Sequence, residues 1–347
     1  MNQVRWAVAG YGAGGRVFHA PLIRDADGID LVAAVSTNPR RAEDARTDGL
    51  AAVDDLSALT ELGVEGVTIT TPAGTHADLA HEALELGLHV VVDKPFAPTA
   101  DQAQSIVDHA AQAGLMLSVY QNRRWDGDFL TVRDALEEIG PVRRFVSTIQ
   151  RFRPELPAWT RDRPSADGGG VLIDLGSHLI DQAVHLLGPA VSVTAELAIL
   201  GTDRVAEDDA IILIEHAGGA RSTVVPSVHS VGDSPRFQVT TERGGVVIDG
   251  FDVQEEQLFD GGSPASLGDD WGLEPVDRTA RVLRDGVWSE QPLRRGEWTA
   301  YYPAIVRAIR DGAPVPVDPL DAVHVAAIFD AARTSSAEER TVRVNDS

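Results

Sequence analysis

The first 120 or so residues alternate between short apolar runs and longer amphipathic stretches, and this alternation constrains the fold more than any other feature. Short continuous apolar runs are typical of strands buried on both faces, and the stretches between them have the length of helices. Strand and helix patterns that repeat about every 10 to 15 residues predict βαβ units and a parallel sheet. The expected strands are 4–9, 29–35, 66–71, 88–94 and 115–120, and the expected helices are 16–26, 39–49, 76–87 and 101–114.

The pattern changes after residue 125, where strand-like runs follow one another without helices between them. Consecutive strands joined by short turns predict a mostly antiparallel sheet in an α+β domain. The chain has 347 residues, more than the roughly 250 to 300 at which one core stops growing, so we predict two domains, 1–124 and 125–347. Segment 260–275 is aperiodic and is predicted to be a long, mobile loop. The expected helices are 127–139, one beginning near 168–170, 297–312 and 319–338, and the expected strands are 142–152, 190–200, 210–217, 220–230, 236–242 and 245–250.

The composition excludes several classes of protein. Acidic residues number 53 against 30 lysines and arginines, which gives a formal net charge of −23. A surface this acidic repels nucleic acid and anionic membranes, so neither is an expected partner. There are no cysteines, hence no disulfides and no thiolate metal sites. The segment MNQVRWAVAG enters a strand at once, and no stretch approaches the roughly 18 apolar residues of a membrane span, so we expect a cytoplasmic protein.

Three glycines, Gly10, Gly12 and Gly15, form a G-x-G-x-x-G pattern between the first expected strand and the first expected helix. Each glycine has a separate task in such a turn: a tight bend, close approach of the backbone to a pyrophosphate, and close packing of helix on strand. The phosphates then lie at the N-terminus of the helix. Together with the second strand that follows, the pattern predicts a dinucleotide site, and Tyr11 is expected to contribute to it.

The end of the second expected strand indicates which dinucleotide binds. An NAD site has an acidic residue about 20 residues after the glycines, and this chain has Ser36 there. The run STNPRR offers neutral groups on Ser36, Thr37 and Asn38 and cations on Arg40 and Arg41, which suit a 2′-phosphate. We therefore predict NADP as the cofactor. NAD stays possible, since the two arginines could simply face solvent at the start of a helix.

Lys94 follows the apolar run VVVD at the end of an expected parallel strand. Open α/β sheets bind ligands at the carboxyl ends of their strands, which favours a functional role over a plain surface position. Pro95 fixes the chain just after the lysine, and a cis peptide bond there would aim the side chain sharply. The segment TPAGTH, 71–76, ends the neighbouring strand, so it should border the cofactor at the same edge.

Four titratable residues lie on one stripe of the expected helix that follows the glycine run: Asp174, His178, Asp181 and His185. Residues four apart share a helix face, and buried polar groups need partners. The stripe could bind a divalent metal. It could be a satisfied structural network, especially at Asp181 and His185. Alternatively, Asp174 and His178 could join Lys94 as an acid–base group facing a substrate hydroxyl.

Taken together, the motifs resemble those of the Gfo/Idh/MocA oxidoreductases. The stretches that carry the resemblance are YGAGGRVFHAPLI, the TP…H turn, HVVVDKP, YQNRRWD and GGGVLIDLGSHLIDQ, in that order along most of the chain. The residues within these motifs are most similar to those of the NADP-dependent scyllo-inositol dehydrogenase branch. The resemblance implies a Rossmann domain followed by an open, largely antiparallel sheet whose free face packs against another subunit, and hence a homodimer or homotetramer.

The resemblance also assigns roles to individual residues. The family's lysine falls on Lys94 and its Asp-x-x-x-His pair on Asp174 and His178, which implies His178 as the proton acceptor and Lys94 as the group that orients the reacting oxygen. The family's Glu-Lys-Pro is Asp-Lys-Pro here. Thr160 separates a Trp-Arg pair that contacts the cofactor in the family, which puts the arginine in doubt. The implied substrate contacts include Tyr120, Asn122 and Arg123, and the implied cofactor contacts include Thr71, Pro72, His76, Asp93, Lys94, Pro95, Trp159 and Arg161.

These patterns predict an NADP-dependent dehydrogenase that reversibly oxidises a secondary alcohol of a cyclitol or sugar, with a small polyol as its partner and no metal. A reductase of another substrate class on the same scaffold is the nearest alternative. A non-catalytic NADP-binding regulator is a second, although such a protein has no use for Lys94, Asp174 and His178 together. A metal-dependent hydrolase built on the acidic and histidine stripe is a third, and it would not require the glycine motif.

Overall fold

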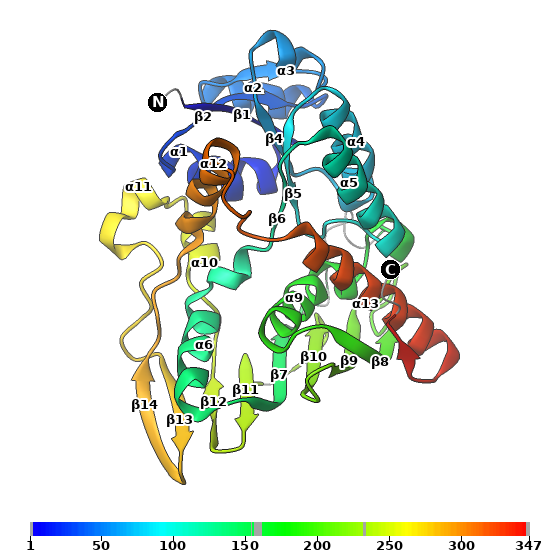
Figure 1. The fold of residues 1–347 in the computed structure, drawn as a ribbon, viewed down its shortest axis with the longest axis vertical. Coiled ribbons are helices and arrows are strands. Elements are labelled where there is room, and N and C mark those ends of the chain that lie inside the picture. Colours follow the sequence, from blue (N-terminus) through cyan, green and yellow to red (C-terminus); the bar gives the residue numbers. More distant parts are fainter. Residues whose placement is uncertain (1–2, 154, 156–161, 232–233, 345–347) are drawn as a thin grey trace.

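A computed structural model describes residues 3–153, 155, 162–231 and 234–344 (Figure 1). The described residues form two sheets, one of six strands and one of nine. In Figure 1 the six-stranded sheet and its helices form the upper lobe, and the nine-stranded sheet spreads across the lower one. This arrangement confirms the predicted fold class, a Rossmann domain combined with an α+β domain whose sheet is mostly antiparallel.

The first sheet has the strand order β3-β2-β1-β4-β5-β6, and all of its strands are parallel. The order reverses between β1 and β4, and ligands bind at such a switch point, beyond the carboxyl ends of the strands. The strands are β1 (Val4–Ala9), β2 (Ile29–Val35), β3 (Ala51–Val53), β4 (Gly66–Ile69), β5 (His89–Asp93) and β6 (Leu117–Tyr120). The helices are α1 (Ala20–Asp25), α2 (Pro39–Thr47), α3 (Ala58–Glu61), α4 (His76–Glu85) and α5 (Ala100–Ala113).

Local signals explain where the helices of this lobe begin and end. The Asn38 side chain accepts hydrogen bonds from the first backbone amides of α2, and Gly49 just beyond its end has a φ of +83°. Thr99 caps α5 in the same way, and Gly114 ends it at a φ of +65°. These are the residue types that satisfy free amides at a helix start and adopt left-handed backbone at its end.

The segment after the glycine motif differs from the prediction of a regular helix. Residues Ala13–His19 form a π-helix, and α1 follows it directly. The Ala20 amide donates to the Gly15 carbonyl, five residues back, as this wider helix requires. The turn carries His19 to a fully buried position under the sheet edge.

The second sheet has the order β14-β13-β12-β11-β7-β10-β9-β8-β15, and its described pairs are antiparallel except β7 with β10. Its strands are β7 (Val142–Gln150), β8 (Ala190–Ala198), β9 (Asp209–His216), β10 (Arg221–Ser227), β11 (Phe237–Thr241), β12 (Gly244–Ile248), β13 (Thr279–Arg284), β14 (Val287–Pro292) and β15 (Val342–Arg343). The helices after residue 125 are α6 (Gly127–Ile139), α8 (Val171–Asp174), α9 (Gly176–Leu187), α10 (Gln254–Phe259), α11 (Pro264–Leu267), α12 (Tyr301–Asp311) and α13 (Pro319–Glu338).

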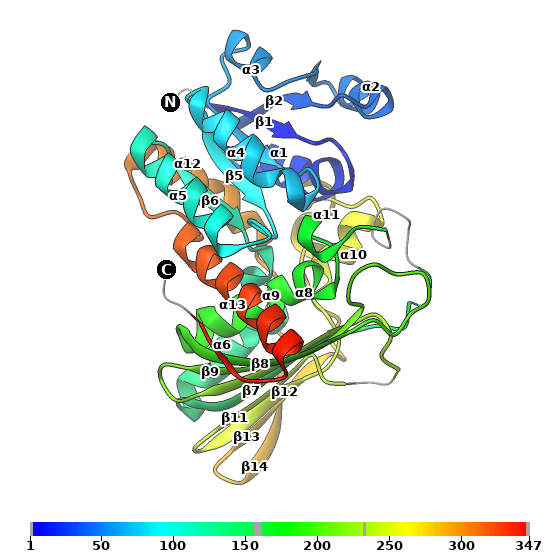
Figure 2. The same ribbon diagram turned by 90° about the vertical axis from the view of Figure 1, so that its right-hand side faces the viewer.

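The nine-stranded sheet has one covered face and one bare face. In Figure 2 the helices α9 and α13 lie between this sheet and the upper lobe. Strand β9 alternates accordingly: Ile212 and Ile214 are buried, whereas Ile211 and Leu213 are 41% and 48% exposed. Alternation with period two places the exposed pair on the face opposite the helices.

The end of the chain ties the two lobes together. Helix α13 packs against α5 of the first lobe and β8 of the second. The Arg124 guanidinium bonds both Asp181 of α9 and Asp321 of α13, at 2.6 and 3.0 Å. The Ser118 hydroxyl of β6 donates to the Val317 carbonyl at 2.9 Å. The boundary predicted between residues 124 and 125 stays a prediction.

The prediction of a long, mobile loop over residues 260–275 was wrong. Ser263 caps the short helix α11 with a reciprocal pair of hydrogen bonds to Ser266, and the Trp271 side chain is 4% exposed. Burial of this large aromatic ring holds a segment whose sequence has no periodicity.

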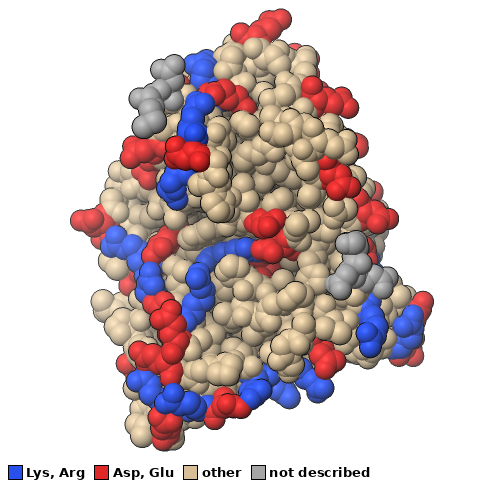
Figure 3. Space-filling view, viewed as in Figure 1, with Lys and Arg blue, Asp and Glu red and all other residues tan. Residues whose placement is uncertain are grey.

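The surface carries charged side chains of both signs. On the face drawn in Figure 3, acidic and basic side chains are interspersed over both lobes. None of the helices in the described part of the chain is apolar over a length that could cross a membrane. The predicted cytoplasmic location stays a prediction.

Candidate active site

The glycine motif forms a tight cradle between β1 and the π-helix. Gly10 has a φ of +95°, a conformation that favours glycine. A Cβ on Gly15 would lie 2.1 Å from the Gly10 carbonyl oxygen, so no side chain fits between helix and strand. Two of the three tasks predicted for the glycines, the bend and the close packing, therefore have a direct geometric basis.

Arg41 lies over the second glycine of the motif. A Cβ on Gly12 would meet the Arg41 guanidinium carbon at 3.3 Å, although the two residues belong to different βα units. The Asn38 side chain accepts hydrogen bonds from the Arg40 and Arg41 amides at 3.0 and 3.3 Å, which fixes the start of α2 beside the cradle. The side chains of Thr37 and Arg40 are exposed, and no contact joins either to the cradle among the described residues.

Tyr11 supports the cradle from inside. Its ring is 1% exposed, and its hydroxyl donates to Asp48 at 3.0 Å. Asp48 also accepts from the Arg16 guanidinium at 2.8 Å. Burial, together with the neighbouring Asp48 carboxylate, raises the pKa of Tyr11 to about 12. The hydroxyl therefore acts as a donor that ties the cradle to the end of α2.

Lys94 lies at the carboxyl end of β5 and reaches across to the second lobe. Its Nζ donates to the Asp174 carboxylate and to the Asp174 carbonyl, both at 2.9 Å. The peptide bond between Lys94 and Pro95 is cis. The ammonium beside Asp174 holds the pKa of that carboxyl below its usual range. The predicted pair of Lys94 and Asp174 thus meets at the edge where a cofactor is expected.

His76 joins the two loops of this edge. Its ring nitrogens lie 2.7 Å from the Thr71 carbonyl and 2.8 Å from the Pro95 carbonyl. The side chain is buried, and burial lowers its pKa. Pro72 is exposed on the rim. The loop 71–76 is therefore fixed to the Asp-Lys-Pro turn, as adjacent parallel strands led us to expect.

The prediction of one helix carrying Asp174 and His178 on a single face was wrong. The helix breaks at Leu175 into α8 and α9, and the Asp174 carbonyl accepts from Lys94 instead of continuing the helix. The Asp174 side chain is 54% exposed, whereas His178 is 5% exposed. The two residues approach the site from separate helices.

His178 is a buried histidine whose Nδ1 has no hydrogen-bond partner among the described residues. Burial lowers its pKa well below the ordinary value, and the positive charges of Lys94 and Arg123 lower it further. The imidazole is therefore neutral near pH 7 and can accept a proton. Its unpartnered nitrogen is a buried polar group of the kind that a bound substrate satisfies.

The three residues predicted to touch substrate lie close to one another along the chain but differ in surroundings. Tyr120 is 2% exposed, and its ring packs against His19 and Tyr301. Asn122 is 6% exposed. Arg123 is buried and pairs with Asp126 at 3.1 Å and, closely, with Glu255. Their substrate contacts stay predictions.

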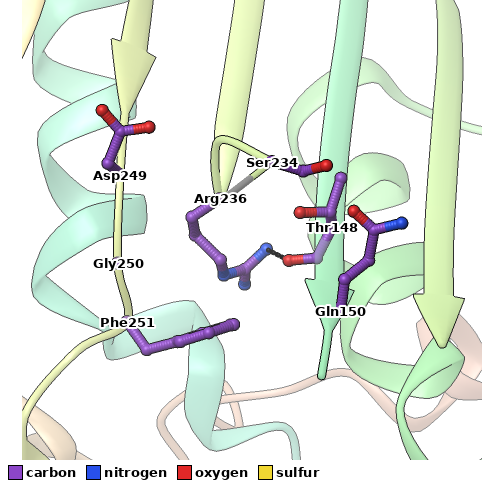
Figure 4. Close-up of a pocket in the computed structure, with 7 residues that line it drawn as sticks. All are labelled: Thr148, Gln150, Ser234, Arg236, Asp249, Gly250 and Phe251. Atoms are coloured by element: carbon purple, nitrogen blue, oxygen red, sulfur yellow. Dashed lines mark hydrogen bonds between the residues drawn. The ribbon is translucent and has the colours of Figure 1, made fainter. Parts of the chain in front are cut away.

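The structure adds residues that the sequence reasoning missed. The guanidinium carbons of Arg151 and Arg236 lie 5.3 and 5.9 Å from the centre of the Phe251 ring, and both charges act on His178. Figure 4 shows Arg236 and Phe251 among the side chains that line a pocket. No ion pair to Arg151 is found within the described ranges. The basic run QRFR at a strand end was a usable signal for Arg151, but no local pattern marks Arg236. A cavity of about 460 Å³ lies here, lined by Thr148, Gln150, Ser234, Arg236, Asp249, Gly250 and Phe251.

The rest of the predicted stripe does not join the site. Asp181 pairs with Arg124 in the interior, and His185 is exposed at the end of α9. Within the part of the chain that the structure describes, no three His, Asp or Glu side chains are grouped to hold a metal ion. Trp159 and Arg161, predicted to contact the cofactor, lie outside the described residues.

Comparison with known proteins places this geometry in a family. Residues 4–121 match the oxidoreductase family with an NAD-binding Rossmann fold, and residues 129–247 match the Gfo/Idh/MocA C-terminal domain. Over 351 aligned residues the chain is 30% identical to scyllo-inositol 2-dehydrogenase (NADP(+)) IolW of Bacillus subtilis, covering 99% of this chain and 96% of IolW. The chain belongs to the Gfo/Idh/MocA oxidoreductase family.

Two further matches cover nearly all of this Gfo/Idh/MocA protein. The Escherichia coli oxidoreductase YdgJ, described as uncharacterized, is 34% identical over 98% of this chain and 99% of its own. The solved structure of yvaA from Bacillus subtilis superposes with a TM-score of 0.92 at 29% identity, covering 99% of both chains. The resemblance predicted from the motifs is confirmed, and the protein is an NAD(P)-binding oxidoreductase.

The cradle of this Gfo/Idh/MocA protein fits such a dinucleotide. A Cβ on Gly12 would lie 3.3 to 3.5 Å from the Arg41 guanidinium, so the absence of a side chain there lets a ligand approach the backbone beside this cation. The residues that could hold the cofactor are Gly10, Gly12, Ser36, Asn38, Arg41 and Thr71. The side chains of Lys94, Asp174 and His178 lie at the same edge of the sheet, where a substrate beside the cofactor would contact them.

Proposed function

We propose that this protein is an NADP-dependent dehydrogenase that converts a secondary alcohol of a cyclitol or sugar to a ketone, reversibly. The observation that carries the proposal is the contact of Lys94 with Asp174 next to the buried, neutral His178, at the carboxyl edge of a dinucleotide-binding sheet. The name of IolW, an NADP-dependent scyllo-inositol 2-dehydrogenase, supports this substrate class.

Each residue of the site has a separate part in the proposed reaction. His178 accepts the hydroxyl proton of the substrate, because burial keeps its imidazole neutral. The Lys94 ammonium donates a hydrogen bond to the reacting oxygen, and Asp174 keeps that ammonium in place. A nicotinamide cofactor held by the cradle around Gly10, Gly12 and Arg41 would supply the hydride acceptor for the same carbon.

The identity of the cation at position 94 supports a role in chemistry. Lys94 is the only lysine in the sequence. All the rest of the 30 lysine and arginine residues are arginines. An arginine guanidinium stays protonated in proteins, whereas a lysine can lose its proton and approach a substrate as a compact charge. In a chain that otherwise uses arginine, a lysine at this position points to proton sharing or point-charge contact with the reacting oxygen.

The preference for NADP rests on Arg41. Its guanidinium lies over the cradle, and the end of β2 carries Ser36 where NAD enzymes have an acid. A guanidinium pairs well with a phosphate, since both groups can form two parallel hydrogen bonds. We therefore propose that Arg41 binds the 2′-phosphate, with Ser36 beside the ribose.

The bare face of the nine-stranded sheet supports a homodimer or homotetramer. Ile211 and Leu213 are exposed on it, next to one another along β9. Exposed apolar patches that belong to one sheet face are typical of subunit interfaces. We propose that a second copy of the chain covers this face.

The proposed reaction is tested by mixing the purified protein with NADP⁺ and a panel of inositols and aldoses at alkaline pH, and following the absorbance of NADPH. Turnover with scyllo-inositol or another cyclitol is the expected result. Silence across the panel, with NADPH binding established by fluorescence, would favour another substrate class or the non-catalytic regulator. Lys94→Met serves as the inactive control for the panel.

A further inference from the structure

A row of buried polar side chains runs behind the Asp-Lys-Pro turn and is not used in the proposed reaction. The Trp6 indole donates to the Thr68 hydroxyl at 2.8 Å, and that hydroxyl lies 3.0 Å from the Tyr302 hydroxyl. The Tyr302 hydroxyl lies 2.6 Å from His19 Nδ1. His19 Nε2 lies 3.5 Å from Asp93 Oδ2. The side chains of Trp6, Thr68, His19 and Tyr302 are at most 1% exposed.

The chemistry of the end groups fixes part of the hydrogen-bond pattern in this row. An indole N–H can only donate, and an ionised carboxylate can only accept. Thr68 therefore accepts from Trp6, and one of the Thr68 and Tyr302 hydroxyls donates to the other. Tyr302 bonds to His19 Nδ1, and His19 Nε2 faces the Asp93 carboxylate at 3.5 Å without a hydrogen bond among the described residues. Burial alone would raise the pKa of Asp93, but His19 and Lys94 lower it below the usual value, so the carboxylate is ionised.

Asp93 connects this row to both parts of the site. Its Oδ1 accepts the Lys94 amide at 2.7 Å. Its Oδ2 lies 3.3 Å from the position that a Cβ on Gly14 would take, just under the cradle. His19 itself is the last residue of the π-helix that begins at the cradle. The cofactor loop and the peptide of Lys94 therefore meet at one carboxylate, which His19 approaches from behind.

We propose that His19 is a positioning residue: through Asp93 it connects the π-helix of the cofactor cradle to the Lys94 turn and sets the location of the Lys94 ammonium relative to Asp174 and His178. His19 touches neither of the groups that react with substrate. Loss of the ring removes the polar neighbour that lies 3.5 Å from Asp93 Oδ2, and a shift of about 1 Å at a reacting group can lower a rate by about a hundredfold. The catalytic consequence rests on the proposed dehydrogenase function, whereas the positioning does not.

Two variants of His19 separate positioning from packing. His19→Leu fills the position with an apolar side chain and removes both ring nitrogens. His19→Gln keeps an amide N–H that can reach Asp93. His216→Gln is the matched control, because His216 is also a buried histidine with two polar partners, but it lies in the second sheet. Tyr302→Phe removes the hydroxyl that lies 2.6 Å from His19 Nδ1 and keeps the ring.

The location of Lys94 can be measured without turnover, because Lys94 is the only lysine. Reductive methylation with ¹³C-formaldehyde labels it and the amino terminus, and the Lys94 signal in an NMR spectrum is identified as the one missing from Lys94→Arg. We expect this signal to move toward that of free dimethyl-lysine in His19→Leu, and to stay at the wild-type position in His19→Gln and His216→Gln.

Kinetics supply the second readout. We expect His19→Leu to lower kcat by about 10- to 100-fold with NADPH affinity unchanged, and His19→Gln to recover most of the loss. An unchanged kcat and an unmoved Lys94 signal in His19→Leu overturn the proposal, as does an equal loss in His19→Leu and His19→Gln. If His19→Leu does not fold, Tyr302→Phe is the deciding variant. We then expect the Lys94 signal to move in the same direction by a smaller amount. An unmoved signal in this variant would contradict the proposal. If the wild type turns over no polyol, the proposed function fails, and the Lys94 signal still tests the positioning.

Discussion

Lys94 places its ammonium on two oxygens of Asp174, one from the side chain and one from the backbone. This contact crosses between the lobes, so one side chain joins the cofactor sheet to the helix break that presents His178. Arg41 makes a contact within the first lobe, where it reaches from α2 to Gly12. Lysine and arginine differ in geometry and in proton affinity, so under the proposed function we expect the identity of the cation to matter at both positions.

Replacing Lys94 with arginine keeps the positive charge and removes the ability to share a proton. We expect Lys94→Arg to lower kcat by about 10²- to 10⁴-fold and to leave the dissociation constant of NADPH unchanged. Steady-state kinetics and a fluorescence titration measure the two effects. Near wild-type turnover in this variant would show that the position needs only a charge.

Removing the guanidinium at position 41 should change the choice of cofactor. Hydrogen bonds to charged groups contribute about 1.5 to 3 kcal/mol, so Arg41→Ala should weaken NADPH binding by about 10- to 100-fold and leave NADH binding as it is. Arg46→Ala is the matched control, because Arg46 is an exposed arginine on the same helix paired with Glu43. Equal losses for the two cofactors would place the 2′-phosphate elsewhere.

At the scale of the element, the π-helix that follows β1 is the part of the fold that most directly serves the site. Its first turn packs so closely on the strand that Gly15 has no space for a Cβ, and its last residue is the buried His19. The break between α8 and α9 is the second such element, because it turns the Asp174 carbonyl toward Lys94. Both departures from regular helix occur where a side chain or a backbone group faces the site, as π-turns often do.

The packing at Gly15 can be tested by adding one methyl group. Gly15→Ala would place its Cβ 2.1 Å from the Gly10 carbonyl oxygen, so the helix must move away from the strand. We expect a loss of about 1 to 3 kcal/mol in the free energy of unfolding, together with weaker NADPH binding. Gly218→Ala is the control, because a Cβ there meets no atom within 4 Å. A stable Gly15→Ala variant with normal cofactor affinity would contradict the close packing.

At the scale of the whole molecule, charge and exposed apolar surface are distributed unevenly. The chain carries 53 acidic residues, yet the centre of the site gathers Lys94, Arg123, Arg151 and Arg236 around His178. Behind this centre several carboxyl groups are buried close together, and their pKa values rise: that of Asp126 to about 6 and that of Glu274 to about 7. Exposed apolar side chains, in turn, gather on the bare face of the nine-stranded sheet, at Ile211 and Leu213.

The buried carboxyl groups predict how stability varies with pH. The pKa of Glu274 is raised by burial from 4.5 to about 7, so the folded protein keeps a proton that the unfolded chain releases. The resulting loss of stability is absent below about pH 4.5 and complete above about pH 7. Glu274→Gln removes it, and its unfolding free energy relative to wild type should rise by about 2 kcal/mol between pH 5 and pH 8 in urea titrations. Glu137→Gln, at an exposed glutamate, controls for the lost charge, and a difference that does not change with pH would contradict the shifted pKa.

The bare sheet face predicts an oligomer. We expect the wild type to elute as a dimer or tetramer, and Leu213→Arg to shift it toward the monomer, because a charge at the centre of an apolar interface is costly. Size-exclusion chromatography with light scattering measures the mass. Val276→Arg is the control, since Val276 is fully exposed outside the sheet. A wild type that is monomeric at every concentration would refute the proposed interface.

Local patterns alone determined most of the fold. The apolar runs of β1, β2, β4 and β5 and the glycine motif between β1 and the π-helix predicted a parallel sheet and a dinucleotide cradle, and the predicted helix over 319–338 coincides with α13. Lys94 could be placed at the sheet edge for the same reason, because strand direction and the position of a residue at a strand end are properties of a short segment.

Contacts between distant segments were decided only by the tertiary structure. The helix breaks at Leu175, where the ammonium of a residue 80 positions earlier bonds to the Asp174 carbonyl. Arg41 lies over Gly12, and Arg151 and Arg236 both lie near the Phe251 ring. These residues come from segments that share no sequence periodicity. Periodicity records which face of an element is buried, but the partner that a polar side chain finds depends on how whole elements pack together.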